Sequence, residues 1–375
     1  MRRPVLHVVP GFGTDGTLRG MERVAATLVK GLEASPDYEP RLCVFRDRDP
    51  VDERHGLSAP ISFLGYQGFD QDWQMAMACA PRLRQLVKDM KPEIVHSHLW
   101  PAAFTCGVAV AGLGIRHVIH IHDQRAWLAS TQIRHRIRRL SQRAVMRITS
   151  PWFIACSGAT ADYSVRHLAC DAGRMTVIRS GIDTRAFSAI PPADRNSFVL
   201  GMAGTLAREK GIGETIKAVA ALKQSGIPCR LKIAGEGTAR KDFERGAAEL
   251  GVQDQVEFLG AVSDMAAFYA GIDVFVLPSF GEGLPLSVLE AMAAARPVVA
   301  SALSGIPEAV SDGTEGLLVP AGNTDALVAA LARLAGDRAL RCDMGGRARD
   351  RALREFSADR MVAECARVYE GFPAE

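Results

Sequence analysis

The stretch "DVFVLPSFGEGLPLSVLEAMAAARPVVAS", residues 273–301, decides the fold of this chain. An apolar run over 273–278 predicts a buried strand, and a loop with two glycines follows it. From 284 to 295 only two residues are polar, which predicts a helix buried on nearly all sides. The next apolar run, 297–301, predicts another buried strand. This strand–helix–strand order is typical of a parallel α/β sheet with helices on its faces.

Apolar runs of the same kind recur along the chain, separated by stretches long enough for helices. The first series covers residues 5–9, 41–45, 93–98, 117–122 and 152–157. The second series covers residues 198–204, 230–235, 256–260, 273–278, 297–301 and 316–320. Two such series predict two Rossmann-like doubly wound domains, each an α/β unit built on a parallel sheet.

The two series meet at "SAIPPADRNS", residues 188–197, where two prolines, a charge pair and the lack of periodicity indicate a linker. We therefore expect an N-terminal domain over 1–188, a linker over 189–197 and a C-terminal domain over 198–354. Residues 355–375 contain a last amphipathic helix, which is expected to return toward the N-terminal domain. Open α/β sheets bind ligands at the carboxyl ends of their strands, so we expect the ligand site in a cleft between the domains.

Composition argues against several classes of protein. The 375 residues are 48% hydrophobic and 23% charged, as in an ordinary globular protein, and a net charge of +3 is too small to indicate a nucleic-acid partner. Eight scattered cysteines without a C-x-x-C pair indicate a reducing compartment. No apolar run reaches the roughly 20 residues that span a bilayer, and the N-terminal run is too short for an export signal. We expect a cytoplasmic protein.

Two carboxylates interrupt the stretch that decides the fold. Glu282 lies in the loop and Glu290 in the helix, where an ionised carboxylate costs several kcal/mol unless it is hydrogen-bonded or paired. Pro285 occupies the expected first helical position, and the helix start directs free N–H groups toward the strand ends, a natural seat for a phosphate. Either Glu290 is satisfied by backbone amides or an arginine, or both glutamates bind hydroxyls of a sugar nucleotide. The local sequence leaves both interpretations open.

The segment "FGEGLPLSVLEAMAAARPVVAS", residues 280–301, resembles the E-x7-E signature of the family 4 retaining glycosyltransferases, which have the GT-B fold. Glu282 and Glu290 occupy its two glutamate positions. Further segments similar to this family follow in family order: 20–32, 92–100, 156–160, 177–187, 203–212, 233–237, 256–262 and 305–319. The resemblance spans nearly the whole chain and implies two Rossmann-like domains that face each other across a cleft.

The resemblance also implies roles for individual side chains. Glu290 would hold the nucleotide ribose, Glu282 would contact the donor sugar, and Lys210 in the loop "GTLAREKG" would bind the diphosphate. His122 in "HIHD" would reach the donor sugar, so it joins Glu282 and Lys210 as a candidate catalytic residue. The other candidates for contact with the donor in these loops are Gly204, Gly281, Gly283, Leu284 and Pro285.

The sequence departs from the family pattern in two loops. Many members have arginine where this chain has Thr205, and Arg208 is the candidate to supply the missing positive charge. In the first loop, Arg19 and Gly20 replace a common Gly-Gly pair, and Gly16 is a candidate to compensate. These departures leave open an alternative in which the chain is a catalytically inactive subunit that binds nucleotide sugars.

Two H-x-H pairs, His96 with His98 and His120 with His122, lie at strand ends. Strand alternation places both members of each pair on one face, and with Asp123 nearby they suit a metal such as zinc. This pattern supports an alternative function as a metal-dependent hydrolase. The family resemblance instead favours contact with the donor for His122 and a structural role for the other three, so no metal site is assigned.

A D-x-D pattern, the metal motif of the other glycosyltransferase fold, occurs in "RDRD", residues 46–49. It lies in a charged loop and is interpreted as a solvated turn. We expect that transfer needs neither a metal nor a cofactor, because fixed positive charge already covers the donor phosphates.

Residues 133–148 hold a marked concentration of positive charge. Six arginines occur there without an acidic residue, beside apolar residues at helical spacing: Ile133, Ile137, Leu140, Ala144 and Ile148. We expect this apolar stripe to pack on its own domain and the arginines to form an exposed basic surface. Such a surface suits an anionic membrane or a lipid-diphosphate acceptor. The candidate docking residues are Arg136, Arg139, Arg143 and Arg147.

With the resemblance, the sequence predicts a retaining glycosyltransferase of EC class 2.4. It would move a hexose-type sugar from a nucleotide diphosphate such as UDP to a saccharide or lipid-linked saccharide acceptor, in bacterial polysaccharide or lipopolysaccharide synthesis. We expect a peripheral position on the inner face of the membrane and no nucleic-acid partner.

Overall fold

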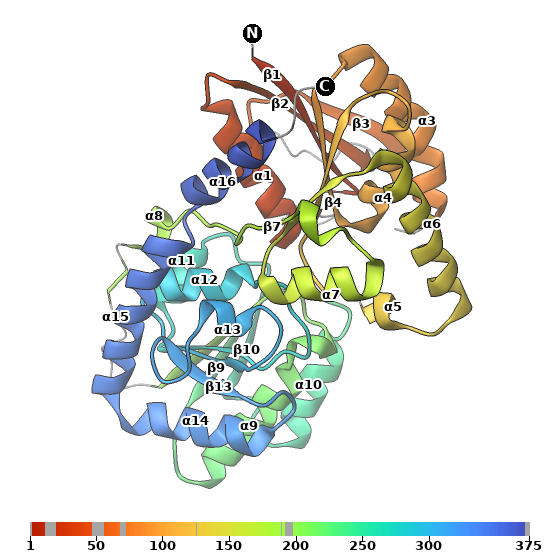
Figure 1. Cartoon of the computed structure of the whole chain (residues 1–375). Helices are drawn as coiled ribbons and strands as arrows, with labels where there is room; N and C mark the ends of the chain where they lie inside the picture. Colours follow the sequence, from red (N-terminus) through yellow and green to blue (C-terminus); the bar gives the residue numbers. More distant parts are fainter. Residues whose placement is uncertain are drawn as a thin grey trace. The chain divides into compact units, whose positions relative to one another are not determined.

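The computed structural model describes residues 2–11, 20–46, 56–67, 73–124, 126–188, 190–191 and 198–371. The chain divides into two compact α/β units. Unit 1 comprises Met1–Ser180 and Ala358–Glu375, and unit 2 comprises Gly181–Ser357. Each unit has its own parallel sheet with helices packed around it (Figure 1).

Unit 1 is built on a seven-stranded parallel sheet in the order β3-β2-β1-β4-β5-β6-β7. Its strands are β1 Arg3–Val9, β2 Tyr38–Arg46, β3 Ile61–Tyr66, β4 Ile94–His98, β5 Arg116–Ile121, β6 Trp152–Ala155 and β7 Met175–Val177. His7 on β1 is in register with His96 on β4, and His98 is in register with His120 on β5. Registered residues of neighbouring strands share a face, so these four histidines line one face of the sheet.

Helices cover this sheet and bury its apolar faces. They are α1 Gly20–Glu33, α3 Trp73–Met90, α4 Leu99–Val110, α5 Ala126–Ala129, α6 Ile133–Thr149, α7 Gly158–Leu168, the 3-10 turn Ala172–Arg174 and α16 Ala358–Glu370. The last helix packs against α1 (Figure 1), where Gly31 leaves room for Val362. Its Tyr369 is fully buried and reaches the histidine face of the sheet.

Unit 2 is built on a six-stranded parallel sheet in the order β10-β9-β8-β11-β12-β13. Its strands are β8 Val199–Ala203, β9 Arg230–Ala234, β10 Val256–Gly260, β11 Val274–Leu277, β12 Val298–Ser301 and β13 Gly316–Val319. Its helices are α8 Arg185–Ser188, the 3-10 turn η2 Arg208–Lys210, α9 Ile212–Gln224, α10 Arg240–Glu249, α11 Met265–Ala270, α12 Leu286–Ala293, α13 Ile306–Ala309, α14 Thr324–Gly336 and α15 Arg338–Glu355. The two parallel sheets confirm the predicted fold class.

Residues 181–188 belong to unit 2, although the sequence placed the end of the first domain at 188. The reason is local packing, because α8 contacts α12 and the buried ring of Phe187 lies 5.6 Å from that of Tyr269. Most of the predicted linker 189–197 lies outside the described residues.

No helix in the described part of the chain combines the length and the apolar composition that a membrane span requires.

Candidate functional site

The loop after β11 leads into α12, the helix predicted from the stretch that decides the fold. Seven of its eight residues are buried, as expected, but the helix begins at Leu286 rather than at Pro285. Pro285 is the N-cap, with φ −72° and ψ 120°, so its expected place as the first helical residue is wrong. A ψ of 120° is extended, whereas a helical residue needs a value near −42°. The missing N–H remains harmless, because an N-cap N–H has no partner inside the helix.

Glu290 lies just over one turn inside α12 and is 1% exposed. Its Oε2 accepts a hydrogen bond from the hydroxyl of Tyr269 on α11 at 2.9 Å, and that hydroxyl also lies 3.1 Å from the Ser287 carbonyl oxygen. Neither interpretation of the sequence named Tyr269, which is 21 residues away and on another helix. The phenol holds the carboxylate in a defined orientation within unit 2.

Glu282 and Lys210 form an ion pair, with Lys210 Nζ 2.7 Å from Glu282 Oε1. The glutamate side chain is 9% exposed and the lysine side chain 28%. The loop and η2 are held together by the Phe280 N–H, which donates to the Glu209 carbonyl at 2.8 Å. Gly211 permits this close approach, since its φ is +72° and a Cβ there would lie 2.1 Å from the Pro278 carbonyl oxygen.

The other candidate donor contacts of unit 2 occupy two environments. Gly283, Leu284 and Pro285 are buried, whereas Gly281 is exposed. Gly204 follows β8 with a φ of +151°, a conformation that favours glycine. Gly204 lies in the loop that leads to Lys210, and the other four lie with Glu282 in the loop after β11.

Arg208 lies on the same turn as Lys210 but is 82% exposed, and its Nη2 pairs with Asp242 at 3.1 Å. Gly20 is the first residue of α1 in unit 1. Gly16 and the two aspartates of the D-x-D pattern lie outside the described residues.

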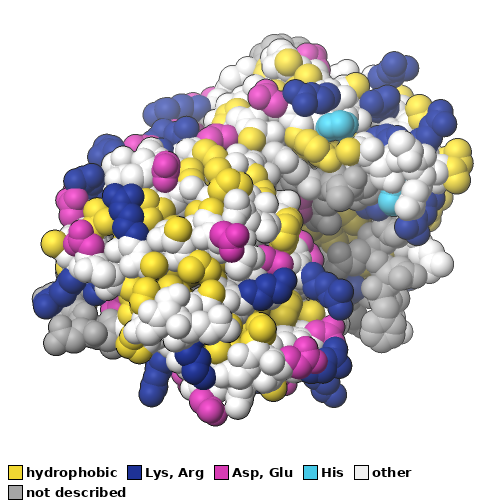
Figure 2. Space-filling model, turned by 90° about the horizontal axis from the view of Figure 1, so that it is seen from below, with side chains coloured by type: hydrophobic (Ala, Val, Ile, Leu, Met, Phe, Trp, Pro, Cys, Tyr) yellow, Lys and Arg dark blue, Asp and Glu magenta, His cyan; other side chains and the backbone are white. Residues whose placement is uncertain are grey.

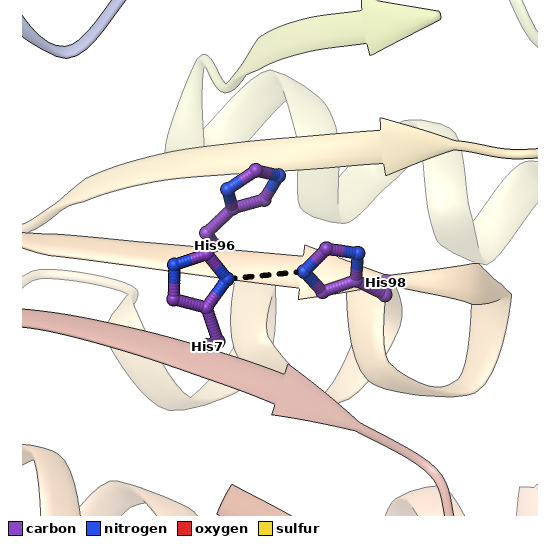
Figure 3. A group of neighbouring side chains, drawn as sticks. All are labelled: His7, His96 and His98. Carbon is purple, nitrogen blue, oxygen red and sulfur yellow. Dashed lines mark hydrogen bonds between the residues drawn. The ribbon is translucent and has the colours of Figure 1, made fainter. Parts of the chain in front are cut away.

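Five histidines gather at the carboxyl end of the unit 1 sheet, and we call them the histidine cluster. They are His7, His96, His98, His120 and His122. His98 is central: its Nε2 lies 3.2 Å from His7 Nδ1, and its Nδ1 lies 3.0 Å from His122 Nε2. Figure 3 shows His7 from β1 pointing at His98 from β4, with His96 beside them. The sequence analysis treated His7 only as part of a strand. Its titratable ring within the apolar run 5–9 was the signal that could have identified it as a member of the cluster.

Burial keeps most of the cluster neutral. His7, His96, His98 and His120 are each at most 1% exposed, whereas His122, one residue beyond β5, is half-buried. Desolvation lowers the pKa of His7 to about 3. Desolvation, and then repulsion from neighbouring rings, lowers the pKa values of His96, His98 and His120 well below the usual range. At neutral pH these rings therefore carry one N–H and one lone pair each.

Some ring nitrogens of the cluster have partners and others have none. His96 Nδ1 lies 2.5 Å from the Tyr369 hydroxyl. Both nitrogens of His120 are buried without a hydrogen-bond partner among the described residues, as are the Nε2 atoms of His7 and His96. Rings stack along the cluster, and those of His120 and His122 lie 4.1 Å apart at 16°.

His117 lies on the opposite face of β5 and is separate from the cluster. Its Nε2 is 2.9 Å from Ser97 Oγ, which donates its own proton to the Val118 carbonyl at 3.1 Å. His117 Nε2 therefore carries a proton and donates it to Ser97. Burial lowers the pKa of His117 to about 3.

The predicted orientation of α6 is wrong. The apolar residues expected to pack on the domain are exposed: Ile133 69%, Ile137 54%, Leu140 60% and Ile148 70%. The buried residues of α6 are instead Gln142 and Met146. In Figure 2, Lys and Arg side chains stand beside hydrophobic ones at the right-hand edge, the side of Figure 1 on which α6 lies.

Three arginines of α6 explain this orientation, because they turn inward and find partners. The guanidinium of Arg138 lies 3.5 Å from the ring centre of Trp100. Arg143 donates to the last carbonyls of α7, at Leu168 and His167, and Arg139 donates to the Ser130 carbonyl. Of the four candidate docking arginines, Arg136 and Arg147 are exposed, whereas Arg139 and Arg143 are half-buried.

Two family models match this chain. The model described as Glycosyltransferase Family 4 matches residues 18–186, and the model described as Glycosyl transferases group 1 matches residues 197–337. The first match includes the H-x-H pairs, and the second includes Lys210, Glu282 and Glu290.

Curated relatives include a glycosyltransferase and a synthase. The D-inositol 3-phosphate glycosyltransferase of Pseudarthrobacter chlorophenolicus is 30% identical over 283 residues, which are 69% of this chain and 66% of that protein. The alpha-maltose-1-phosphate synthase of Mycolicibacterium smegmatis is 29% identical over 307 residues, which are 74% of this chain and 78% of that protein.

Solved structures share the fold over nearly the whole chain. The sucrose-phosphate synthase of Thermosynechococcus elongatus has a TM-score of 0.83 at 20% identity, covering 98% of both chains. Anabaena HepE in complex with UDP and glucose has a TM-score of 0.83 at 20% identity, covering 98% of this chain and 99% of that one. WaaG, a glycosyltransferase involved in lipopolysaccharide biosynthesis, has a TM-score of 0.78 at 17% identity, covering 98% and 100%. The GT-B fold implied by the sequence is confirmed.

Proposed function

The chain belongs to family 4 of the glycosyltransferases, and from this premise we propose that it transfers a sugar from a nucleoside diphosphate donor to an acceptor hydroxyl with retention at the anomeric carbon. The observation that carries the proposal is the ion pair Lys210–Glu282, at 2.7 Å, which joins η2 before α9 to the loop before α12. Glu290 lies deeper in the same unit, held by Tyr269.

The positive charge that binds the donor diphosphate is already present in the free protein, on Lys210. In the free protein, Lys210 and Glu282 neutralise each other. A diphosphate near the start of α12 competes for the ammonium group of Lys210, whose partly exposed side chain can turn toward it. Glu282 is then released to accept hydrogen bonds from the donor sugar, and Glu290 holds the ribose hydroxyls.

Transfer proceeds by front-face displacement. The bond between the anomeric carbon and the diphosphate oxygen breaks, and its electron pair leaves with the diphosphate. Lys210 and the first N–H groups of α12 stabilise the charge that develops there. The acceptor oxygen bonds to the anomeric carbon from the same side, and its proton passes to the departing diphosphate.

UDP is the nucleotide we assign to the donor. The support is the HepE structure, which shares the fold and holds UDP and glucose. The turnover assay below, with its panel of UDP-sugars, identifies the sugar.

The acceptor is a saccharide or a lipid-linked saccharide, and α6 docks the enzyme on an anionic membrane. Exposed Ile133, Ile137 and Ile148 supply apolar contact, while Arg136 and Arg147 supply positive charge beside them. A helix with apolar side chains flanked by arginine suits the interface of an anionic bilayer. This orientation supports docking more strongly than the basic surface expected from the sequence, because apolar side chains also insert.

Transfer needs no metal or other cofactor, because Lys210 and the helix N–H groups supply fixed positive charge to the diphosphate. A chelator should therefore leave turnover unchanged.

The test is a turnover assay with a panel of UDP-sugars and saccharide or lipid-linked acceptors, with NMR assignment of the new anomeric centre. Retention of configuration in a chelator-resistant reaction is the expected result. Thermal stabilisation by UDP-sugars without turnover would favour the inactive-subunit alternative. Release of free sugar that stops on chelation would favour the metal-dependent hydrolase.

A further inference from the structure

We propose that His98, His120 and His122 of unit 1 form a binding site for a divalent transition-metal ion, with Zn²⁺ as the best match. One ring nitrogen from each residue lies within 4.8 Å of the other two. The residues come from the ends of the neighbouring strands β4 and β5, so a rigid part of the sheet positions them. The inference does not rest on the proposed transfer reaction, which uses no metal.

His120 provides the observation that points to a ligand. It is 1% exposed, and neither of its ring nitrogens has a hydrogen-bond partner in the described part of the chain. A buried polar ring with both nitrogens unsatisfied is uncommon in proteins and costs free energy. A metal ion bound to one nitrogen would satisfy that atom and explain why a histidine stands here.

His98 and His122 already present two nitrogens to one point. His98 Nδ1 and His122 Nε2 lie 3.0 Å apart. Two imidazoles bound tetrahedrally to zinc at about 2.0–2.1 Å have nitrogens roughly 3.3 Å apart, so the pair needs to open by only a few tenths of an ångström. The ion would replace the proton that the two nitrogens share in the metal-free protein.

His7 completes the arrangement as a second-shell group. When His98 Nδ1 binds the ion, the proton of that neutral ring must sit on Nε2. His98 Nε2 lies 3.2 Å from His7 Nδ1, which can accept this proton in a hydrogen bond (Figure 3). Ligating histidines almost always donate their other N–H in this way, and the contact fixes the ring.

The second possible trio, His7 with His96 and His98, is a poorer site. All three rings are fully buried, so a dication there would have no water ligand and no compensating charge. His96 Nδ1 is also engaged by Tyr369. In contrast, His122 is half-buried, so the trio of His98, His120 and His122 is not fully enclosed.

The ligand chemistry selects the class of ion. Three neutral imidazoles with one open position match Zn²⁺, Co²⁺ and similar metals, whereas Mg²⁺ and Ca²⁺ prefer oxygen ligands.

The test is titration of the chelator-treated full-length protein with Co²⁺, followed by visible absorption, and then displacement by Zn²⁺. We expect one equivalent of Co²⁺ to give the d–d bands of a four-coordinate site, and Zn²⁺ to abolish them. Mg²⁺ should have no effect. The readout does not involve turnover, so its failure would leave the proposed transfer untouched, and a failure of transfer would leave the metal site untouched.

Variants locate the ion. His122→Ala and His120→Phe should each weaken Co²⁺ binding by at least tenfold, while His117→Gln, on the other face of β5, should bind as the wild type does. His167→Gln, in the last turn of α7, controls for binding at a histidine outside the cluster. If His120→Phe fails to fold, His122→Ala still tests the site, because His122 is only half-buried. Absence of the d–d bands in the wild type, or unchanged affinity in folded His122→Ala, overturns the proposal.

Discussion

In unit 2, Lys210 and Glu282 keep opposite charges 2.7 Å apart in loops where the lysine side chain is 28% exposed. In unit 1, His98 and His120 sit at the end of the same kind of sheet, but they are buried and neutral. The difference follows from position. Side chains in loops can stay charged beside a partner, whereas side chains within strands lose their hydration and with it their charge. The ion pair of unit 2 suits a site where a bound diphosphate replaces Glu282 as the partner of Lys210. The neutral histidines of unit 1 suit a metal ion, which binds the lone pairs of their nitrogens.

The largest effect should come from Glu282→Gln, which removes the negative charge of the Lys210–Glu282 ion pair. We expect turnover per folded molecule to fall by roughly 10²–10³, because in the proposed reaction the carboxylate contacts the reacting sugar and an amide cannot stabilise its developing positive charge. Affinity for UDP alone should stay nearly intact, since no sugar is present. The measurements are steady-state kinetics with UDP-sugar and calorimetry with UDP.

Glu244→Gln is the matched control, because Glu244 pairs with Arg240 on the exposed side of α10 in the same unit. It should change neither quantity. Normal turnover in a folded Glu282→Gln variant would reduce Glu282 to a residue that shapes the loop.

The next effect concerns the buried carboxylate of unit 2. Glu290→Ala should weaken UDP binding by about 1.5–3 kcal/mol, the scale of a hydrogen bond to a charged group. Tyr269→Phe should weaken it less, because it removes only the group that orients the carboxylate. Calorimetry with UDP and with uridine checks both variants. If Glu290→Ala folds and binds UDP as tightly as the wild type, Glu290 does not belong to the donor site.

A third experiment uses His117 to test whether the buried histidines of unit 1 are neutral. Burial lowers its pKa to about 3, against 6.5 in the unfolded chain, so the unfolded state takes up a proton first as pH falls. The stability that this group contributes is complete above pH 6.5 and is lost between pH 6.5 and 3. At pH 5 the loss is about 2 kcal/mol.

His117→Gln keeps a donor for Ser97 but cannot titrate, so its loss of stability between pH 7 and pH 5 should be smaller by that amount. Urea unfolding followed by tryptophan fluorescence is the measurement, because all four tryptophans lie within residues 73–152 of unit 1. Equal pH dependence in the variant and the wild type would show that His117 is not a neutral buried ring.

The smallest effect should come from the surface of α6. Arg136→Gln with Arg147→Gln should weaken binding to phosphatidylserine vesicles by up to about 2 kcal/mol at low salt, and by less at physiological salt. Vesicle sedimentation measures it. Arg347→Gln with Arg354→Gln, two exposed arginines of α15, makes the same change of charge and should have no effect. Equal binding by all three proteins would refute docking through α6.

Patterns within short stretches of the sequence were sufficient to predict the fold class. The apolar runs predicted all six strands of the unit 2 sheet and five of the seven strands of the unit 1 sheet, but they missed β3 and β7. The apolar stretch after Gly283 predicted buried α12 within two residues at each end. The E-x7-E spacing identified the family, because it depends on one loop and one helix that are contiguous in sequence. These features require only hydrophobic periodicity and turn residues, which act over a few positions.

Contacts between distant segments required the tertiary structure. The sequence placed His98, His120 and His122 correctly at strand ends, whereas His96 lies in the middle of β4. Only the neighbouring position of β1 and β4 brings His7 to His98. The partners Tyr269 for Glu290 and Glu282 for Lys210 depend in the same way on which elements pack together.

The sequence by itself determined the two α/β units, the loop and the helix that carry Glu282 and Glu290, and the family. The tertiary structure decided which face of α6 is exposed and which side chains meet. The physical reason is that hydrophobic periodicity shows that a helix has two faces but not which face is buried. In α6 the choice depends on partners from elsewhere in the chain, the ring of Trp100 and the carbonyls at the end of α7, which let arginines pack inward and turn isoleucines outward.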